Sequence, residues 1–149
     1  MFGLFKLFFG SDEQDSQFSK TAANAVTSLD IKAEIIGHEN WKMRLKIYLD
    51  GQSSEKFTPE VVCHDNRCHL GQWIHGPGQE AMGKFPGFSA LMRHHQMFHY
   101  VASNVVALDE AGKKVEARHM LNTQFQEYSD SVVQDLKNLS ALAEYAGNK

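Results

Sequence analysis

Apolar residues recur at steps of three and four along most of this chain, the spacing that places them on one face of an α-helix. From about Ser19 to Asp50 there is no proline and no glycine except Gly37, so we expect one long helix. Gly51 follows at the point where such a helix should end. The stripe of this helix consists of Ile31, Ile35, His38, Leu45 and Tyr48.

The next part of the chain predicts short helical pieces. Thr58 and Pro59 stand in the order of an N-cap residue followed by a proline at the first helical position. A short helix is expected to start near residues 65–66, to carry Cys68, and to end at the Gly-Pro-Gly of residues 76–78. These pieces connect the first long helix to the next one.

Two further long helices complete the predicted fold. One covers residues 88–109, a turn follows at residues 111–113, and the last helix extends to about Tyr145. No strand pattern of comparable strength and no internal repeat is present. We therefore predict an all-α fold, an antiparallel four-helix bundle with an additional short helix that carries the cysteine ligand.

The length of 149 residues allows one domain with a substantial core. We expect an apolar N-terminal segment and polar hinge over residues 1–18, a helical bundle over residues 19–146, and a tail over residues 147–149. The formal net charge is −3, and no cluster of Lys and Arg marks a nucleic-acid surface. Nucleic acid is therefore excluded as an expected partner.

The two cysteines, Cys63 and Cys68, are too few for a disulfide scaffold, and no secretory signal is recognisable. We expect a reduced, cytoplasmic protein. The first ten residues are strongly apolar, but crossing a bilayer takes about 20. We interpret residues 1–9 as a helical extension packed on a partner subunit. Contact with a membrane surface and docking onto another signalling protein are the alternatives.

Eight histidines are the unusual feature of the composition. His95 and His99 lie four positions apart and therefore share one helical face. His38 lies on the inward stripe of the first helix, and Cys68 lies next to the apolar residues of the short helix. Buried imidazoles need partners, and three histidines with one cysteine form a tetrahedral donor set typical of zinc. The spacing alone leaves open whether the four residues converge.

Three stretches of the sequence closely resemble the bacterial chemoreceptor zinc-binding domain family. Residues 38–42 read HENWK, residues 68–73 read CHLGQW, and residues 95–99 read HQMFH. They match, in order, a histidine before a Trp-Lys pair, a Cys-x-Leu-Gly-x-Trp motif and a His-x-x-Phe-His motif. The resemblance extends from about Asp30 to Leu136.

This resemblance implies an antiparallel helical bundle, often a homodimer, in which His38, Cys68, His95 and His99 hold Zn²⁺. Domains of this family usually belong to chemoreceptors or diguanylate cyclases, and one of these is the signalling partner that the resemblance implies. In some members the zinc-bound cysteine responds to oxidants such as hypochlorous acid. We expect no output domain within these 149 residues, so the process that the chain controls, chemotaxis or another, is left open.

Other residues receive simpler interpretations. His94 points about 100° away from its neighbour His95 and is not expected to be a ligand. Cys63 is interpreted as a free thiol, with a role as resolving partner for an oxidised Cys68 as the minority alternative. Core packing is expected for Trp41 and Trp73, and a close helix contact for Gly71. The residues expected to be solvated are His64, His69, His75 and His119.

These observations favour a sensor over an enzyme. A zinc hydrolase is the enzymatic alternative, but Gln96 stands where a His-Glu-x-x-His motif has its general base, and four protein ligands leave no position for water. A diiron or haem bundle would need inward carboxylates that the stripes lack. A structural zinc site or a zinc buffer is the non-enzymatic alternative. No catalytic residue is therefore predicted.

The predicted mechanism depends on Cys68. Zinc holds this thiol as a thiolate and clamps the short helix against the first and third helices. The thiolate would sense zinc availability or an oxidant, because its oxidation weakens the ligand and shifts the bundle or the dimer.

Overall fold

The computed structural model describes residues 12–147, and every regular element in this range is a helix. The segment Ile74–Gly78 joins the helices His69–Trp73 and Gln79–Met82 across a kink, and a π-helical turn, Leu121–Phe125, joins Lys114–Met120 to Gln126–Gly147. The α-helices are α2 (Asp12–Thr27), α3 (Ile31–Leu49), α4 (Pro59–Val62), α5 (His69–Trp73), α6 (Gln79–Met82), α7 (Pro86–Glu110), α8 (Lys114–Met120) and α9 (Gln126–Gly147).

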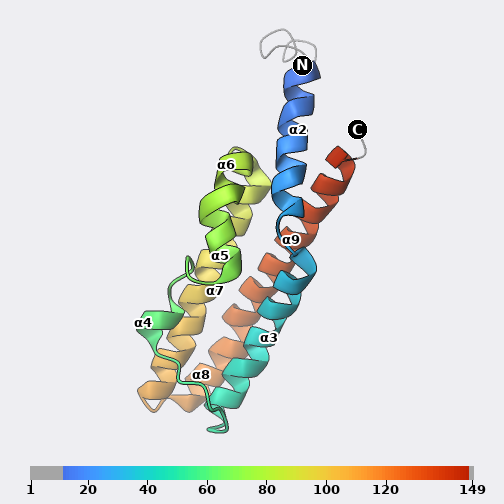
Figure 1. Ribbon diagram of the computed structural model, residues 1–149. Helices are drawn as coiled ribbons and strands as arrows, with labels where there is room; N and C mark the ends of the chain where they lie inside the picture. The colour runs from blue at the N-terminus through green and yellow to red at the C-terminus, as the bar shows by residue number, and fades with distance from the viewer. Residues whose placement is uncertain (1–11, 148–149) are drawn as a thin grey trace.

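The helices form an elongated bundle with four columns, as Figure 1 shows. The chain descends through α2 and α3, returns through the short helices α4, α5 and α6, descends again through α7, and ascends through α8 and α9. The long column α8–α9 packs against α2, α3 and α7. The all-α class is therefore confirmed, and the additional short helix next to Cys68 is present as α5.

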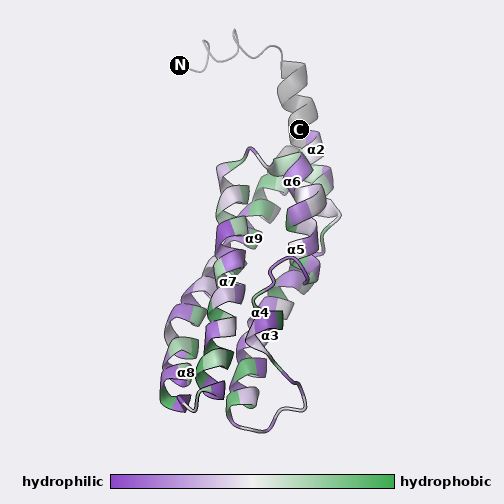
Figure 2. Cartoon of the chain, turned by 90° about the vertical axis from the view of Figure 1, so that its left-hand side faces the viewer, coloured by the Kyte–Doolittle hydropathy of each residue, from purple (hydrophilic) through white to green (hydrophobic). Residues whose placement is uncertain are grey.

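The core lies along the axis of the bundle. In Figure 2, hydrophobic and hydrophilic residues alternate along the helices, as expected of helices with one buried side. Burying a side chain such as Phe or Leu contributes roughly 1.5–3 kcal/mol, so this core supports the bundle independently of any metal. The largest fully buried apolar side chains include Phe88, Phe98, Phe125, Leu45, Leu49, Leu70 and Ile74.

The prediction of one unbroken first helix is wrong, because the chain breaks between α2 and α3. The hydroxyl groups of Thr27 and Ser28 donate hydrogen bonds back to the carbonyl groups of Ala23 and Ala25, both at 2.6 Å. Such bonds compete with helix propagation. Asp30 then caps the new helix, since its carboxylate accepts the N–H of the third residue of α3 at 3.1 Å. α3 therefore begins as a helix separate from α2.

The Gly-Pro-Gly segment interrupts the short helix, as predicted, and a further short helix, α6, follows it. Gly76 adopts non-helical angles (φ −123°, ψ −110°), which produces a kink. Gly78 then lies so close to the rings of Trp73 and Phe88 that a Cβ atom there would be 2.8 and 2.9 Å from them. This packing keeps α6 against the core. Sequence periodicity does not reveal α6, because a helix of four residues is too short for a repeat.

The other boundaries agree with the predictions within a few residues. Pro86 begins α7 two positions before the predicted start, and Gly51 and Gly112 have positive φ values of 74° and 78° at the turns after α3 and α7. α2 begins at Asp12, inside the acidic stretch that follows the apolar N-terminus. The interpretation of residues 1–9 concerns a segment outside the described residues. None of the helices from 12 to 147 is both long enough and apolar enough to span a bilayer.

Candidate metal centre

Four side chains from three parts of the chain converge inside the bundle. His38, Cys68, His95 and His99 each offer one ligand atom, and these atoms lie within 4.8 Å of one another. The Sγ atom of Cys68 and the Nε2 atom of His99 are both 3.2 Å from Nε2 of His95. Donor atoms about 2.0–2.3 Å from a tetrahedral zinc ion are roughly 3.3–3.8 Å apart. The spacing therefore fits one zinc ion.

Local structure positions each of these side chains. The buried residues of α3 are His38, Leu45 and Leu49, and His38 is the polar one among them. His95 and His99 are one turn apart on α7, and both are buried. Cys68 lies at the N-cap of α5 in extended backbone (φ −77°, ψ 162°) and not inside the helix.

Backbone carbonyl groups orient two of the imidazole rings. Nδ1 of His38 is 2.7 Å from the Glu34 carbonyl oxygen, and Nδ1 of His99 is 3.0 Å from that of Val62. If each Nδ1–H donates to its carbonyl, each Nε2 keeps a lone pair for the centre. Nε2 of His38 is buried and has no hydrogen-bond partner among the described residues. A metal ion would supply the missing partner.

The third imidazole is held by packing. Nδ1 of His95 is also buried, with no hydrogen-bond partner in the described part of the chain. The ring of His95 is nearly parallel to the ring of Phe98, at 5° and with 6.4 Å between ring centres. The edge of the His38 ring also faces Phe98, with the ring centres 5.2 Å apart. Phe98, the phenylalanine of the HQMFH motif, thus supports two candidate ligands from its fully buried position.

Burial favours the forms of histidine that bind metal. Desolvation lowers the pKa of His95 to about 2, with a further contribution from the neighbouring imidazoles. Desolvation likewise lowers the pKa of His99 to about 4 and lowers that of His38. The three rings are therefore neutral near pH 7, as metal ligation requires.

Cys68 binds a metal ion only after its thiol has lost a proton. Burial raises the pKa of the Cys68 thiol, and the nearby carboxylates of Glu34 and Asp65 raise it further. The N–H of Gly71 donates to the sulfur at 3.3 Å and favours the thiolate, but this effect is smaller than that of burial. A cation bound beside the sulfur would stabilise the thiolate.

The segment before Cys68 is held close to α5. A Cβ atom on Gly71 would be 1.7 Å from the Asp65 carbonyl oxygen and 3.1 Å from the Asn66 Cα atom. Gly71 makes a close contact, as predicted, but with the backbone of this turn segment and not with another helix. Nε2 of His75 pairs with the Asp65 carboxylate at 2.9 Å and fixes the same segment.

A further ion pair connects this region to α3. The Glu34 carboxylate pairs with Nδ1 of the exposed His69. The Glu34 backbone carbonyl oxygen is the hydrogen-bond partner of Nδ1 of His38. His69 directly follows Cys68, so Glu34 contacts the neighbourhoods of two candidate ligands. The sequence predicts only solvation for His69 and His75. Both are exposed, and each has a carboxylate partner.

Residues expected to lie outside the site do so. His94 pairs through Nδ1 with the Asp135 carboxylate of α9 at 2.6 Å. Cys63 is an exposed free thiol that bonds to the Glu60 carbonyl oxygen at 3.4 Å. Its possible role as a resolving thiol stays a prediction. His64 and His119 are exposed.

The two tryptophans differ in their surroundings. Trp73 is buried, and its Nε1–H donates to the Ala25 carbonyl oxygen at 3.0 Å, which ties α5 to α2. Trp41 is only half-buried, and its ring centre lies 6.0 Å from that of His99. The Arg44 guanidinium lies 4.3 Å above the Trp41 ring. Trp41 is thus part of the wall of the metal centre on its outer side.

Sequence reasoning did not identify the outer partners Glu34 and Val62. Both contribute backbone carbonyl groups, which leave no mark on residue type. Glu34 lies four positions before His38, the distance at which a helical side chain can reach a carbonyl, so that partner has a weak sequence signal. Val62 reaches His99 from α4, and only the tertiary structure brings them together.

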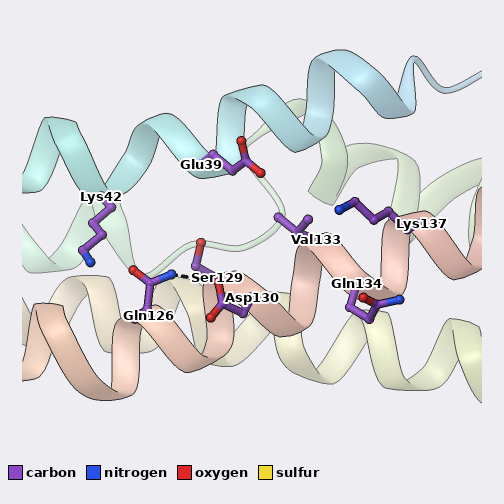
Figure 3. Close-up of a pocket in the computed structure, with 8 residues that line it drawn as sticks. All are labelled: Glu39, Lys42, Gln126, Ser129, Asp130, Val133, Gln134 and Lys137. Atoms are coloured by element: carbon purple, nitrogen blue, oxygen red, sulfur yellow. Dashed lines mark hydrogen bonds between the residues drawn. The ribbon is translucent and has the colours of Figure 1, made fainter.

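A separate pocket of about 470 Å³ lies between α3 and α9, as Figure 3 shows. Glu39 and Lys42 line it from α3, and Gln126, Asp130 and Lys137 are among its residues on α9. None of the four converging side chains lines it. The α3–α9 contact is therefore incompletely filled along its polar side.

A helical bundle that gathers three histidines and one cysteine around one point belongs to the class of metal-binding α-helical proteins. Residues 38–106 match the model of the chemoreceptor zinc-binding domain family, which confirms the resemblance found in the sequence. The match begins at His38 and includes the other three converging residues. Searches of curated proteins and of solved structures gave no match. Zinc as the cofactor agrees with both the family and the donor set.

Proposed function

We propose that this chain is a sensory or regulatory zinc protein in which His38, Cys68, His95 and His99 hold the metal. The observation that carries the proposal is the convergence of these donor atoms, within 4.8 Å of one another, from α3, α5 and α7. A zinc ion at this point would link α3, α5 and α7 to one another. A change at one ligand therefore affects the contact between elements.

A regulatory role is favoured over catalysis by the number of ligands. Four protein donors complete the tetrahedral shell, whereas catalytic zinc keeps a position for water or substrate. Gln96, at the position where a His-Glu-x-x-His motif has its base, is exposed and follows His95 directly. The non-enzymatic alternative, a structural or zinc-buffering site, predicts that no partner responds to the state of Cys68.

α3 is the element best suited to report the state of the site. Of its 19 residues, the buried ones are His38, Leu45 and Leu49, so the candidate ligand is one of few inward anchors. The polar pocket of Figure 3 lies between α3 and α9 and leaves room for a shift. Loss of the metal contact at His38 would therefore loosen the first half of α3. The effect would be larger than in a helix that is held by many buried side chains.

Oxidation of Cys68 provides a defined signal. With hypochlorous acid, the thiolate sulfur attacks chlorine and the Cl–O bond breaks, which releases hydroxide. Hydroxide then displaces chloride from the sulfur, so the sulfur loses two electrons and gains an S–OH group. The sulfenic acid is a weaker ligand than the thiolate. Cys68 would then cease to anchor the N-cap of α5 to the centre, and the segment from Asp65 to Gly71 would move.

We expect a Cys68→Ala variant to lose the oxidant response while keeping its helices. In the zinc-loaded wild type, hypochlorous acid in slight excess should release zinc to a chromogenic chelator within the mixing time. The variant should bind zinc at least roughly 100-fold more weakly and show no oxidant-dependent release of what remains. Cys63→Ala is the matched control and should behave like the wild type, because Cys63 is exposed and outside the cluster.

Equal release from both variants would contradict a role for Cys68 in sensing. If zinc leaves on oxidation but hydrogen exchange in α3 and α5 is unchanged, the site is structural or buffering. Protection of α3 and α5 that falls together with zinc content supports the sensor.

Homodimerisation and docking onto a chemoreceptor or diguanylate cyclase are parts of the same proposal. The outer face of α3 carries Ile36, Met43 and Ile47, which are 55, 64 and 39% exposed. These positions are seven and four residues apart and form one stripe. A second copy of this face would bury the stripe, and a homodimer formed in this way would place two metal-sensitive α3 helices side by side.

A Met43→Glu variant is expected to shift the protein from dimer to monomer in sedimentation velocity, because two carboxylates would face each other in an apolar contact. Val115→Glu is the control. Val115 is 80% exposed on α8, outside the α3 stripe, and its replacement should leave sedimentation unchanged. A wild-type protein that sediments as a monomer at all concentrations would refute the α3 dimer.

A further inference from the structure

A surface pocket of about 460 Å³ opens onto two of the four candidate ligands, Cys68 and His99. Cys68 is only partly buried, while the three histidines are buried. Trp41 and Phe57 are among the walls of the pocket. A small molecule that enters this pocket meets the metal centre at its thiol.

The charges in this pocket are unbalanced. Arg44, Lys56 and Arg67 line it together with a single carboxylate, Glu55. Arg44 pairs with Glu55 at 2.5 Å, which neutralises one cation. The side chains of Lys56 and Arg67 form no ion pair with any residue between 12 and 147 that the structure describes. The pocket thus has a positive excess in a chain whose net charge is −3.

One side of the pocket is aromatic. The Arg44 guanidinium stacks on Trp41 at 4.3 Å and lies 5.4 Å from the centre of the Phe57 ring. Lys56 and Arg67 are exposed, so an anion can reach both of them from solvent. Arg67 directly precedes Cys68 in the chain, and both residues line the pocket.

The pocket between α3 and α9 provides a comparison. It has almost the same volume, about 470 Å³, but two lysines, Lys42 and Lys137, are balanced there by Glu39 and Asp130. In Figure 3 the charged groups of both signs are distributed along the same groove. The two pockets therefore differ in the balance of their charged side chains.

We propose that the pocket beside Cys68 binds small anions and directs anionic thiol-reactive compounds to the Cys68 sulfur. The ligand class is a monovalent carboxylate or oxyanion small enough for a pocket of this volume. Lys56 and Arg67 attract the anion, and the aromatic walls hold its uncharged part. The inference rests on the proposed function only in requiring a reactive Cys68, and it adds a selectivity for negatively charged reactants.

Two alkylating reagents of almost equal size test this selectivity, iodoacetate, which is anionic, and iodoacetamide, which is neutral. In both reactions the Cys68 sulfur attacks the CH₂ carbon, a C–S bond forms and iodide leaves. The zinc-loaded Cys63→Ser protein is used so that modification of the exposed thiol does not interfere. The rate of Cys68 modification is followed by mass spectrometry at low ionic strength, and the iodoacetate-to-iodoacetamide ratio is compared with that of N-acetylcysteine.

The expected ratio is roughly 10-fold higher in the protein than in N-acetylcysteine, the lower end of electrostatic steering effects. A Lys56→Gln, Arg67→Gln double variant should bring the ratio back to that of the small thiol, and added salt should do the same in the parent protein. Because both reagents attack the same sulfur, the ratio is insensitive to changes in sulfur reactivity. A Lys42→Gln, Lys137→Gln variant, with two cations removed from the other pocket, should keep the high ratio.

A ratio equal to that of N-acetylcysteine, or one that survives removal of Lys56 and Arg67, would overturn the anion pocket. Zinc release that still depends on Cys68 would then leave the proposed function standing. If neither reagent modifies Cys68, access through the pocket is refuted. The zinc-release comparison of Cys68→Ala with Cys63→Ala then decides separately on the sensor.

Discussion

Replacement of His95 by alanine should remove most of the zinc from the purified protein. Nε2 of His95 lies 3.2 Å from both the Cys68 sulfur and Nε2 of His99, so this candidate ligand atom contacts two of the other three. Loss of an outer hydrogen-bond partner typically lowers metal affinity 10–100-fold, and loss of a ligand should exceed about 100-fold. Elemental analysis after dialysis against a weak chelator, with about one zinc per wild-type chain expected, measures the effect.

His94→Ala is the matched control for this experiment. His94 is the adjacent residue on α7, but its ring pairs with Asp135 and lies outside the cluster. Its side chain is 35% exposed, so loss of this pair should cost less than about 1 kcal/mol and leave the zinc content unchanged. Circular dichroism should show the same helix content in both variants. Full zinc in His95→Ala would mean that the four residues are not the ligand set.

Replacement of Gly71 by alanine should be strongly destabilising and should also weaken zinc binding. The added Cβ atom would lie 1.7 Å from the Asp65 carbonyl oxygen, a distance that only a shift of backbone can relieve. Overpacking of this kind typically costs 1–3 kcal/mol, and a contact with backbone belongs to the upper part of the range. Since the shifted segment leads into Cys68, the free energy of unfolding and the zinc affinity should fall together.

Gly37→Ala is the comparison that separates this contact from a general effect of removing glycine. Gly37 lies in α3 next to His38, and a Cβ atom there would meet no atom within 4 Å. Alanine should stabilise this helix by about 0.5–1 kcal/mol because glycine is a poor helix former. Chemical denaturation of both variants with and without zinc provides the measurement. An equal loss of stability in the two variants would contradict the close contact at Gly71.

The helical periodicity of the sequence was sufficient to identify the bundle. The long stripes of α7 and α9 were recognised because each is long enough for apolar positions to recur several times. The break at residues 28–30 was missed because it depends on hydrogen bonds from Thr27, Ser28 and Asp30, residue types that also occur inside helices. Short helices such as α6 carry too few residues for a period to show.

Sequence and tertiary structure contributed different parts of the metal centre. The sequence by itself determined the donor types, because His95 and His99 share a helical face through local geometry and the motifs around His38 and Cys68 match the zinc-binding family. Local periodicity relates only residues within a few turns of one helix. Only the tertiary structure decided that the four donors meet, that the Glu34 and Val62 carbonyl groups orient two rings, and that cations gather beside Cys68. These depend on packing between segments far apart in the chain, which the order of residue types does not encode locally.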